Sequence, residues 1–241
     1  MHPLDGPKLK VNRAKEHLDR LSEAIRSFFD TRPMDFTTNF DEQNSRKIIR
    51  VSMSRDVPAR ISIIAGDAMY NLRSALDQTA YQLAYLSGKE PNSRCEFPIS
   101  DKRPDGRKQK ELMKKLEGIP ADAIKMINIF QPYTRAYDVE SHPLWLLDTL
   151  CNHDKHRGLT ASGTLAVVTL PNIDGITSKK IDGRTVELSF PVQQENFEPM
   201  ISPGIQFLAH RLGNRVSDGT LFEIYEFINQ HVLPRFERFF P

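Results

Sequence analysis

The segment after Pro58 constrains the fold most, because its apolar residues keep a helical spacing for about seven turns. The series predicts a helix over residues 60–86, which ends near Gly88. A helix with so broad an apolar face has to pack against other elements to keep that face from water. The apolar positions are Ile61, Ile64, Ala65, Ala68, Met69, Leu72, Ala75, Leu76, Ala80 and Leu83.

A second helix is predicted over residues 8–29, with the same spacing, before Arg32-Pro33 stops it. Between the two helices, alternation and turn residues predict a β-hairpin at about 34–54. Shorter helices are predicted at about 107–116, 120–130 and 143–157.

The pattern then changes to strands, at 164–170, after the Asp182-Gly183 turn and at 205–209. A last helix is predicted over 218–238, ended or kinked by Pro234. We therefore expect an α+β fold: a predominantly helical core over 8–157 with β-hairpin strands, in one domain spanning 1–241.

Composition excludes several classes of protein. The 241 residues carry a net charge of +2, which points neither toward nor away from nucleic acid. The two cysteines, Cys95 and Cys151, form no disulfide framework and fit a reducing compartment. The start of the sequence has no leader-like apolar stretch, and the longest apolar run is too short for a bilayer. We expect a cytoplasmic protein without a membrane partner.

The first polar segment that points to chemistry is 66–78, on the long helix. Its wet face carries Asn71, Arg73 and Asp77 in place of the usual Lys and Glu. One interpretation is a buried polar contact that another helix covers. The other is a site lined by these three residues.

The second polar segment, 152–157, closes the helix that begins at Pro143. Asp154 projects toward the apolar side of that helix and needs a partner, for which Arg73 is a candidate. His153 and His156 share roughly one helix face and can transfer protons near neutral pH. Lys155 and Arg157 can hold phosphate, although cations at a helix C-terminus are also favourable by themselves.

Other motifs give weaker indications of function. Residues 102–115 are rich in Lys and Arg, and Arg107 and Lys108 are candidates for contact with a phosphate backbone; a solvated helix face is the alternative. His153-Asp154 is similar to the paired ligands of HD-type phosphohydrolases, which also need an upstream His and a downstream Asp, here His142 and Asp174. Zinc spacings, a Walker loop and a dinucleotide fingerprint are absent from the sequence.

The two polar segments carry a resemblance to an uncharacterised bacterial family. Its marks are a Gly-Asp-x-x-x-Asn-Leu-Arg-Ser-Ala-Leu-Asp helix, here 66–77, and a Leu-Trp-x-Leu…Asn-x-Asp-Lys-His-Arg segment, here 144–157. More distantly, the Arg73–Gln78 stretch resembles the Arg…His motif of HEPN domains, helical bundles common in RNA-cleaving toxins and defence proteins. Gln78 stands where that family has His, and Gln cannot exchange a proton.

The resemblance implies an RNA-acting protein that assembles its site across a homodimer. Our leading hypothesis is a HEPN-like, metal-independent RNase that needs no cofactor. In it, Arg73, Lys155 and Arg157 hold phosphate, His156 moves the proton, and Asn71 and Asp154 orient the others. His153 and Asp77 are further candidates for the catalytic site. The alternatives are a non-enzymatic interaction module, whose polar segments fix helix packing, and a metal-dependent phosphohydrolase.

Overall fold

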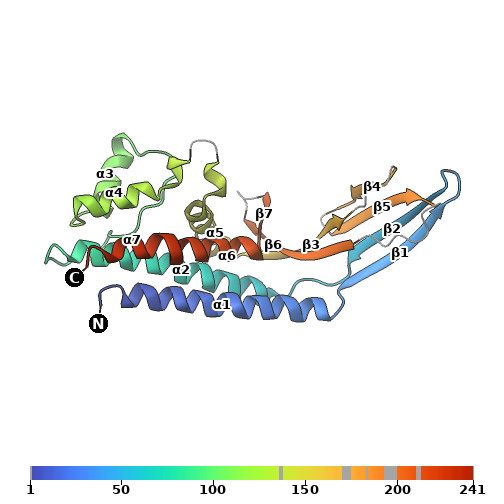
Figure 1. The fold of residues 1–241 in the computed structure, drawn as a ribbon, viewed down its shortest axis with the longest axis horizontal. Coiled ribbons are helices and arrows are strands. Elements are labelled where there is room, and N and C mark those ends of the chain that lie inside the picture. The colour runs from blue at the N-terminus through green and yellow to red at the C-terminus, as the bar shows by residue number, and fades with distance from the viewer. Residues whose placement is uncertain are drawn as a thin grey trace.

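The computed structural model describes residues 2–135, 138–169, 175–182, 184–192, 200–209 and 213–240. The molecule is elongated, with a body of helices at one end and an arm of antiparallel strands at the other (Figure 1). Both termini lie at the end of the helical body away from the arm. The fold is thus α+β in a single domain with a mainly helical core, as the periodicity predicts.

Two long antiparallel helices form the centre of the body: α1 (Asp5–Asp30) and α2 (Ala59–Tyr85). Strands β1 (Met34–Asp41) and β2 (Arg46–Met53) connect them as a hairpin that reaches out into the arm (Figure 1). The predicted helices and hairpin are therefore confirmed. The inward face of α2 is rich in alanine, which lets neighbouring helices approach closely.

The core lies between these two helices and the C-terminal helices. Burial of an aliphatic or aromatic side chain contributes about 1.5–3 kcal/mol, so this cluster dominates the stability of the body. Its largest fully buried side chains are Leu4, Leu18, Leu21, Ile61, Met69, Leu72, Leu76, Leu83, Phe97, Phe207 and Phe236.

Three shorter helices build the upper part of the body: α3 (Gly106–Lys115), α4 (Ala121–Ile129) and α5 (Pro143–Arg157). Two single 3₁₀ turns, η1 (Pro132–Thr134) and η2 (Val139–Ser141), lie between α4 and α5. All three helices were predicted. Helix α5 packs on α2 and so brings the two polar segments of the sequence to one interface.

The arm is a four-stranded sheet with the order β1-β2-β5-β4, where β5 is Thr185–Pro191 and β4 is Thr177–Lys180. The predicted alternation is confirmed in β5, in which every second residue, Val186 to Phe190, is buried. Gly183 of the predicted turn lies outside the described residues.

A second sheet, β3-β6-β7, leads from the body toward the arm (Figure 1). Strands β3 (Thr160–Thr169) and β6 (Met200–Ala209) begin earlier than predicted, and β7 (Gly213–Ser217) was not predicted. The last position of the predicted strand 164–170 lies outside the described residues.

The C-terminal helix runs through α6 (Asp218–Glu226), a π-helical segment η3 (Phe227–Val232) and α7 (Leu233–Glu237). Pro234 lies in the first turn of α7. Because proline lacks an N–H, it cannot continue the regular α-helical ladder, and the wider turns of η3 precede it. The predicted interruption is thus a change of helix type.

Candidate functional site

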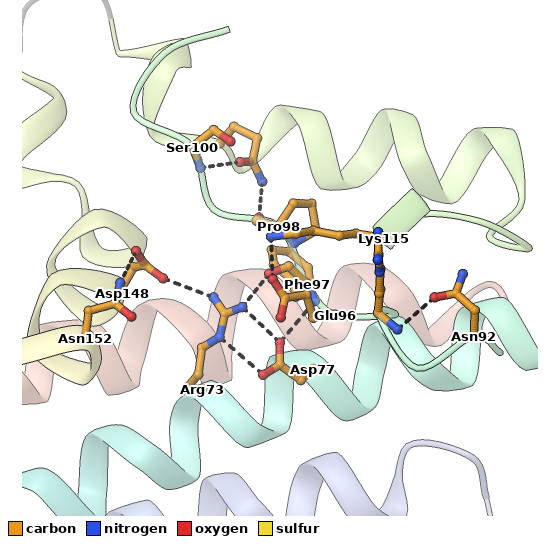
Figure 2. Close-up of polar contacts among 12 residues, drawn as sticks. Arg73, Asp77, Asn92, Glu96, Phe97, Pro98, Ser100, Lys115, Asp148 and Asn152 are labelled. Carbon is orange, nitrogen blue, oxygen red and sulfur yellow. Dashed lines mark hydrogen bonds and ion pairs between the residues drawn. The ribbon is translucent and has the colours of Figure 1, made fainter. Parts of the chain in front are cut away.

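Arg73 lies at the centre of the polar contacts between α2 and its neighbours (Figure 2). Its Nε donates to Asp77 Oδ2 at 3.2 Å, and its Nη2 lies 3.1 Å from Asp77 Oδ1. These two residues are one helical turn apart on α2, the spacing at which side chains meet. The Arg73 side chain is only 13% exposed, so this ion pair is largely shielded from water.

The same pair holds the segment that follows α2. Arg73 Nη2 donates to the carbonyl of Phe97 at 2.8 Å, and the Phe97 N–H donates to Asp77 Oδ1 at 3.0 Å. The Phe97 side chain is fully buried and meets Phe236 edge to face. Gln131 fixes the next turn of the segment by accepting from Ser100 N–H and donating to a backbone carbonyl. Arg73 and Asp77 therefore form a clamp that seats Phe97 in the core.

Helix α5 joins this clamp through Asp148, whose Oδ1 lies 3.5 Å from Arg73 Nη1 (Figure 2). Asn152 Nδ2 donates to the other Asp148 oxygen at 2.9 Å. Burial raises the pKa of both Asp77 and Asp148, and the Arg73 charge opposes the shift without cancelling it. Arg73 Nη1 is buried and has no hydrogen-bond partner among the described residues, and its contact with Asp148 is an ion pair only.

The predicted partnership of Asp154 with Arg73 is wrong. The Asp154 carboxylate lies over Gly66, where an added Cβ would be 2.7 Å from Oδ2, and its Oδ1 accepts from Leu159 N–H at 3.1 Å. Asp154 thereby satisfies its need for a donor at the turn that follows α5. A glycine at position 66 allows the Asp154 carboxylate to lie this close to the α2 backbone.

Asn71 points away from this interface, toward α1. Its Nδ2 donates to the backbone carbonyl of Asp67 at 2.8 Å, and its Oδ1 accepts from Lys10 Nζ at 3.5 Å. Gln78 donates to Ser74 Oγ and lies 3.1 Å from where a Cβ on Gly6 would stand. The residue at the position of the HEPN histidine therefore faces α1 and not the Arg73 clamp.

His156, Lys155 and Arg157 are exposed in the last turn of α5, and His153 is half-buried there. Gly158, with φ 72°, ends the helix. His156 lies about 12 Å further along α5 than Asp148, the residue that contacts Arg73. The structure therefore brings the two polar segments together but does not bring His156 to Arg73 within one chain.

A hollow of about 420 Å³ lies between α3 and the segment before it. Lys102, Arg103, Lys108 and Lys115 line it, together with three acidic residues. Of the two basic residues predicted to contact nucleic acid, Lys108 faces this hollow. Arg107 does not: its side chain is 92% exposed and pairs with Glu111 on its own helix.

Arg103 also borders two neighbouring hollows. One, of about 650 Å³, is lined by Lys102, Tyr133 and Arg135. The other, of about 540 Å³, is mainly apolar and lies between α3 and α4. The Arg103 guanidinium carbon lies 5.9 Å from the centre of the Tyr133 ring, within cation–π range.

Sequence reasoning missed two parts of these sites. Asp148 had a signal, because it precedes Asn152 by one helical turn on the predicted helix that the second polar segment closes. Arg103 belonged to the basic stretch, but Tyr133 comes from beyond α4 and only the fold places it beside Arg103.

Within the described ranges, no three His, Cys, Asp or Glu side chains gather as ligands for a metal ion. Asp174, a candidate ligand of the phosphohydrolase alternative, lies outside those ranges. Both cysteines are free. None of the described helices combines the length and the apolar character that a membrane crossing needs.

Comparison of the chain with protein-family models, with curated proteins and with solved structures finds no match.

Proposed function

We propose that this protein binds single-stranded nucleic acid, in the first place RNA, through the surface around Arg103. The observation that carries the proposal is the position of Arg103 at the junction of three adjoining hollows. Lys102 and Arg135 line one of these hollows with Arg103, and Lys102 and Lys108 line another. The three hollows together are called the Arg103 surface below.

The chemistry of this surface fits both parts of a nucleotide chain. Cations attract the phosphate backbone, and the release of counterions from that backbone favours binding. Aromatic and apolar surfaces accept unstacked bases without reading their sequence. The hollow between α3 and α4 offers such a surface beside Tyr133, with Met113 and Ile129 more than half exposed.

The proposal is binding without cleavage by the Arg73 clamp. Arg73 already makes contacts with Asp77, Phe97 and Asp148, so its donors are largely committed to holding the fold. A transition-state phosphate needs donors that are free to meet it. The resemblance to HEPN domains supports RNA as the ligand class, while the position of His156 gives no support to catalysis by a single chain.

The test is fluorescence anisotropy with a short unstructured RNA and with total tRNA, in EDTA and at two salt concentrations. We expect Arg103→Ala to weaken binding about tenfold and to flatten the salt dependence by about one counterion. Arg107→Ala is the matched control, since it removes the same charge from a neighbouring side chain that faces none of the hollows. An equal loss in both variants, or no binding by folded wild-type protein, would overturn the proposal.

The same reactions test catalysis, because the RNA can be recovered and sized. We expect it to remain intact with wild-type protein. Cleavage in EDTA that His156→Ala abolishes, in a variant with unchanged melting temperature, would instead support the metal-independent RNase hypothesis.

A further inference from the structure

Strand β1 is an exposed edge strand. Within the described residues it pairs with β2 on one side only, and its six central residues, 35–40, are all exposed. Phe36 and Phe40 expose 61% and 63% of their surface. Figure 1 shows β1 running along one edge of the arm, far from α3 and α4.

The two edges of this sheet differ in how they are protected. The opposite edge, β4, has only four residues and ends in Lys179 and Lys180, and short edge strands with lysines resist pairing with other chains. β1 has eight residues, an unbroken register with β2 and neither lysine nor proline. Apart from the charged Asp35 and Asp41 near its ends, it therefore lacks the usual devices that keep an edge strand from pairing.

The backbone of β1 offers free groups at alternate residues. Pro33 carbonyl accepts from Ser54 N–H at 2.8 Å, which sets the alternation along the hairpin. Odd-numbered residues of β1 therefore bond to β2, while the N–H and C=O groups of Phe36, Thr38 and Phe40 point to the open edge.

The strand sequence is nearly symmetric about Thr38. It reads Asp-Phe-Thr-Thr-Asn-Phe-Asp from Asp35 to Asp41, so a two-fold axis at Thr38 exchanges the two phenylalanines and the two aspartates. We propose that two copies of this chain pair their β1 strands antiparallel about Thr38 and join their four-stranded sheets into one continuous sheet. The pairing is isologous, so it closes as a dimer.

The geometry of this register is self-consistent. The residues that face each other across the new edge are Phe36 and the partner's Phe40, Thr38 and the partner's Thr38, all with outward backbone groups. They exchange about six backbone hydrogen bonds. The phenylalanines lie on one face as two cross-strand aromatic pairs, which stabilise antiparallel strands.

On the opposite face of the paired strands, a repulsive contact predicts how association responds to salt and to removal of charge. Asp35 there faces the partner's Asp41, at both ends of the pairing, and like charges directly opposite each other weaken a sheet. Association is thus expected to strengthen with ionic strength. Asp35→Asn is expected to tighten it about fivefold. A single strand pair is a small interface, so dissociation constants on the order of micromolar to hundreds of micromolar are expected.

Sedimentation equilibrium of the full chain over a concentration series tests the proposal. Thr38→Pro removes one outward N–H and leaves every bond to β2, since proline is tolerated on an edge with its nitrogen toward solvent. We expect a monomer with unchanged circular dichroism, while Thr38→Val, which keeps the N–H, remains dimeric. If Thr38→Pro does not fold, the pair Phe36→Lys and Phe40→Lys, at exposed side chains, provides the same test.

A wild-type protein that stays monomeric at millimolar concentration would overturn the proposal. So would a dimer that persists in Thr38→Pro or in the lysine variant, or one that Asp35→Asn weakens. The proposal is independent of RNA binding, and neither experiment reads out the other.

Discussion

The contact between Gly66 and Asp154 is the sharpest test of how α2 and α5 pack. A Cβ on Gly66 would lie 2.7 Å from Asp154 Oδ2, closer than Cβ atoms approach in folded proteins, and 3.1 Å from its Cγ, which is a tight contact. The carboxylate would have to move, and in moving it would lose the hydrogen bond from Leu159 N–H. The effect of Gly66→Ala on stability therefore depends on Asp154.

Gly66→Ala has opposing effects on the free energy of unfolding. Alanine in a helix interior is favoured over glycine by about 1 kcal/mol. Overpacking costs about 1–3 kcal/mol, and the lost hydrogen bond adds about 1 kcal/mol. We expect Gly66→Ala to lower the free energy of unfolding by about 1–3 kcal/mol. In an Asp154→Ala background the clash is absent, so the same change should raise stability by up to about 1 kcal/mol.

Urea unfolding of the two single variants and the double variant measures this difference. The expected coupling energy is about 2–4 kcal/mol, at or above the upper end of the range for residues in contact. Gly219→Ala in α6 is a suitable control, since the nearest atom to its added Cβ is an ordinary 3.5 Å away. A Gly66→Ala change that stabilises the protein equally with and without Asp154 would refute the close contact of the Asp154 carboxylate with Gly66.

Two further predictions concern the polar interior. Asp77→Ala should lower the free energy of unfolding by about 2–3 kcal/mol. This is less than the cost of breaking a fully buried pair, because 35% of the Asp77 side chain is exposed. Proteolysis within residues 86–105 should accelerate, since the Phe97 N–H loses its acceptor, and an unchanged urea midpoint would show that the clamp does not hold Phe97. His142 is buried and caps α5 by accepting from Leu144 N–H, and burial lowers its pKa to about 4. The unfolded chain protonates His142 at a higher pH than the folded chain does. The free energy of unfolding should therefore fall by at most about 3 kcal/mol as the pH falls from about 6.5 to 4. His142→Asn, which keeps a capping acceptor, should flatten that part of the stability profile.

Most of the secondary structure was predictable because it depends on local periodicity. The long helices, the first hairpin and the alternation in β5 all follow from patterns within one segment. Strand β7 was not predictable, because its five residues carry no alternating pattern and it forms only by pairing with β6. Phe97 shows the same limit: it lies in a proline-rich segment that reads as a surface loop, yet it is fully buried.

The candidate site shows the same contrast between local patterns, which the sequence reveals, and tertiary contacts, which it does not. The sequence selected both polar segments, since an Arg and two short acidic or amide groups on the wet face of a long helix indicate a packed polar contact. It could not assign the partners, because Asp148 and Asp154 lie less than two helical turns apart on α5, and either satisfies the composition argument. The choice between these two partners decides whether Arg73 lies near the histidines of the catalytic hypothesis. With Asp154 as its partner, Arg73 would lie close to the exposed histidine end of α5; with Asp148 it lies deeper, beside Phe97.

That depth explains why Arg73 suits a structural role. Its contacts join a helix to a loop and to a second helix, and each of the three elements reaches its position through the same guanidinium. A catalytic arginine needs donors that substrate can reach, whereas this one has a buried Nη1 that no acceptor meets within hydrogen-bond geometry. The exposed cations around Arg103 have the opposite character: they border open hollows beside an aromatic ring and an apolar platform. Arg73, Asp77 and Asp154, which the sequence made conspicuous, therefore contribute to packing, and the less conspicuous basic stretch is the better place to look for what the protein binds.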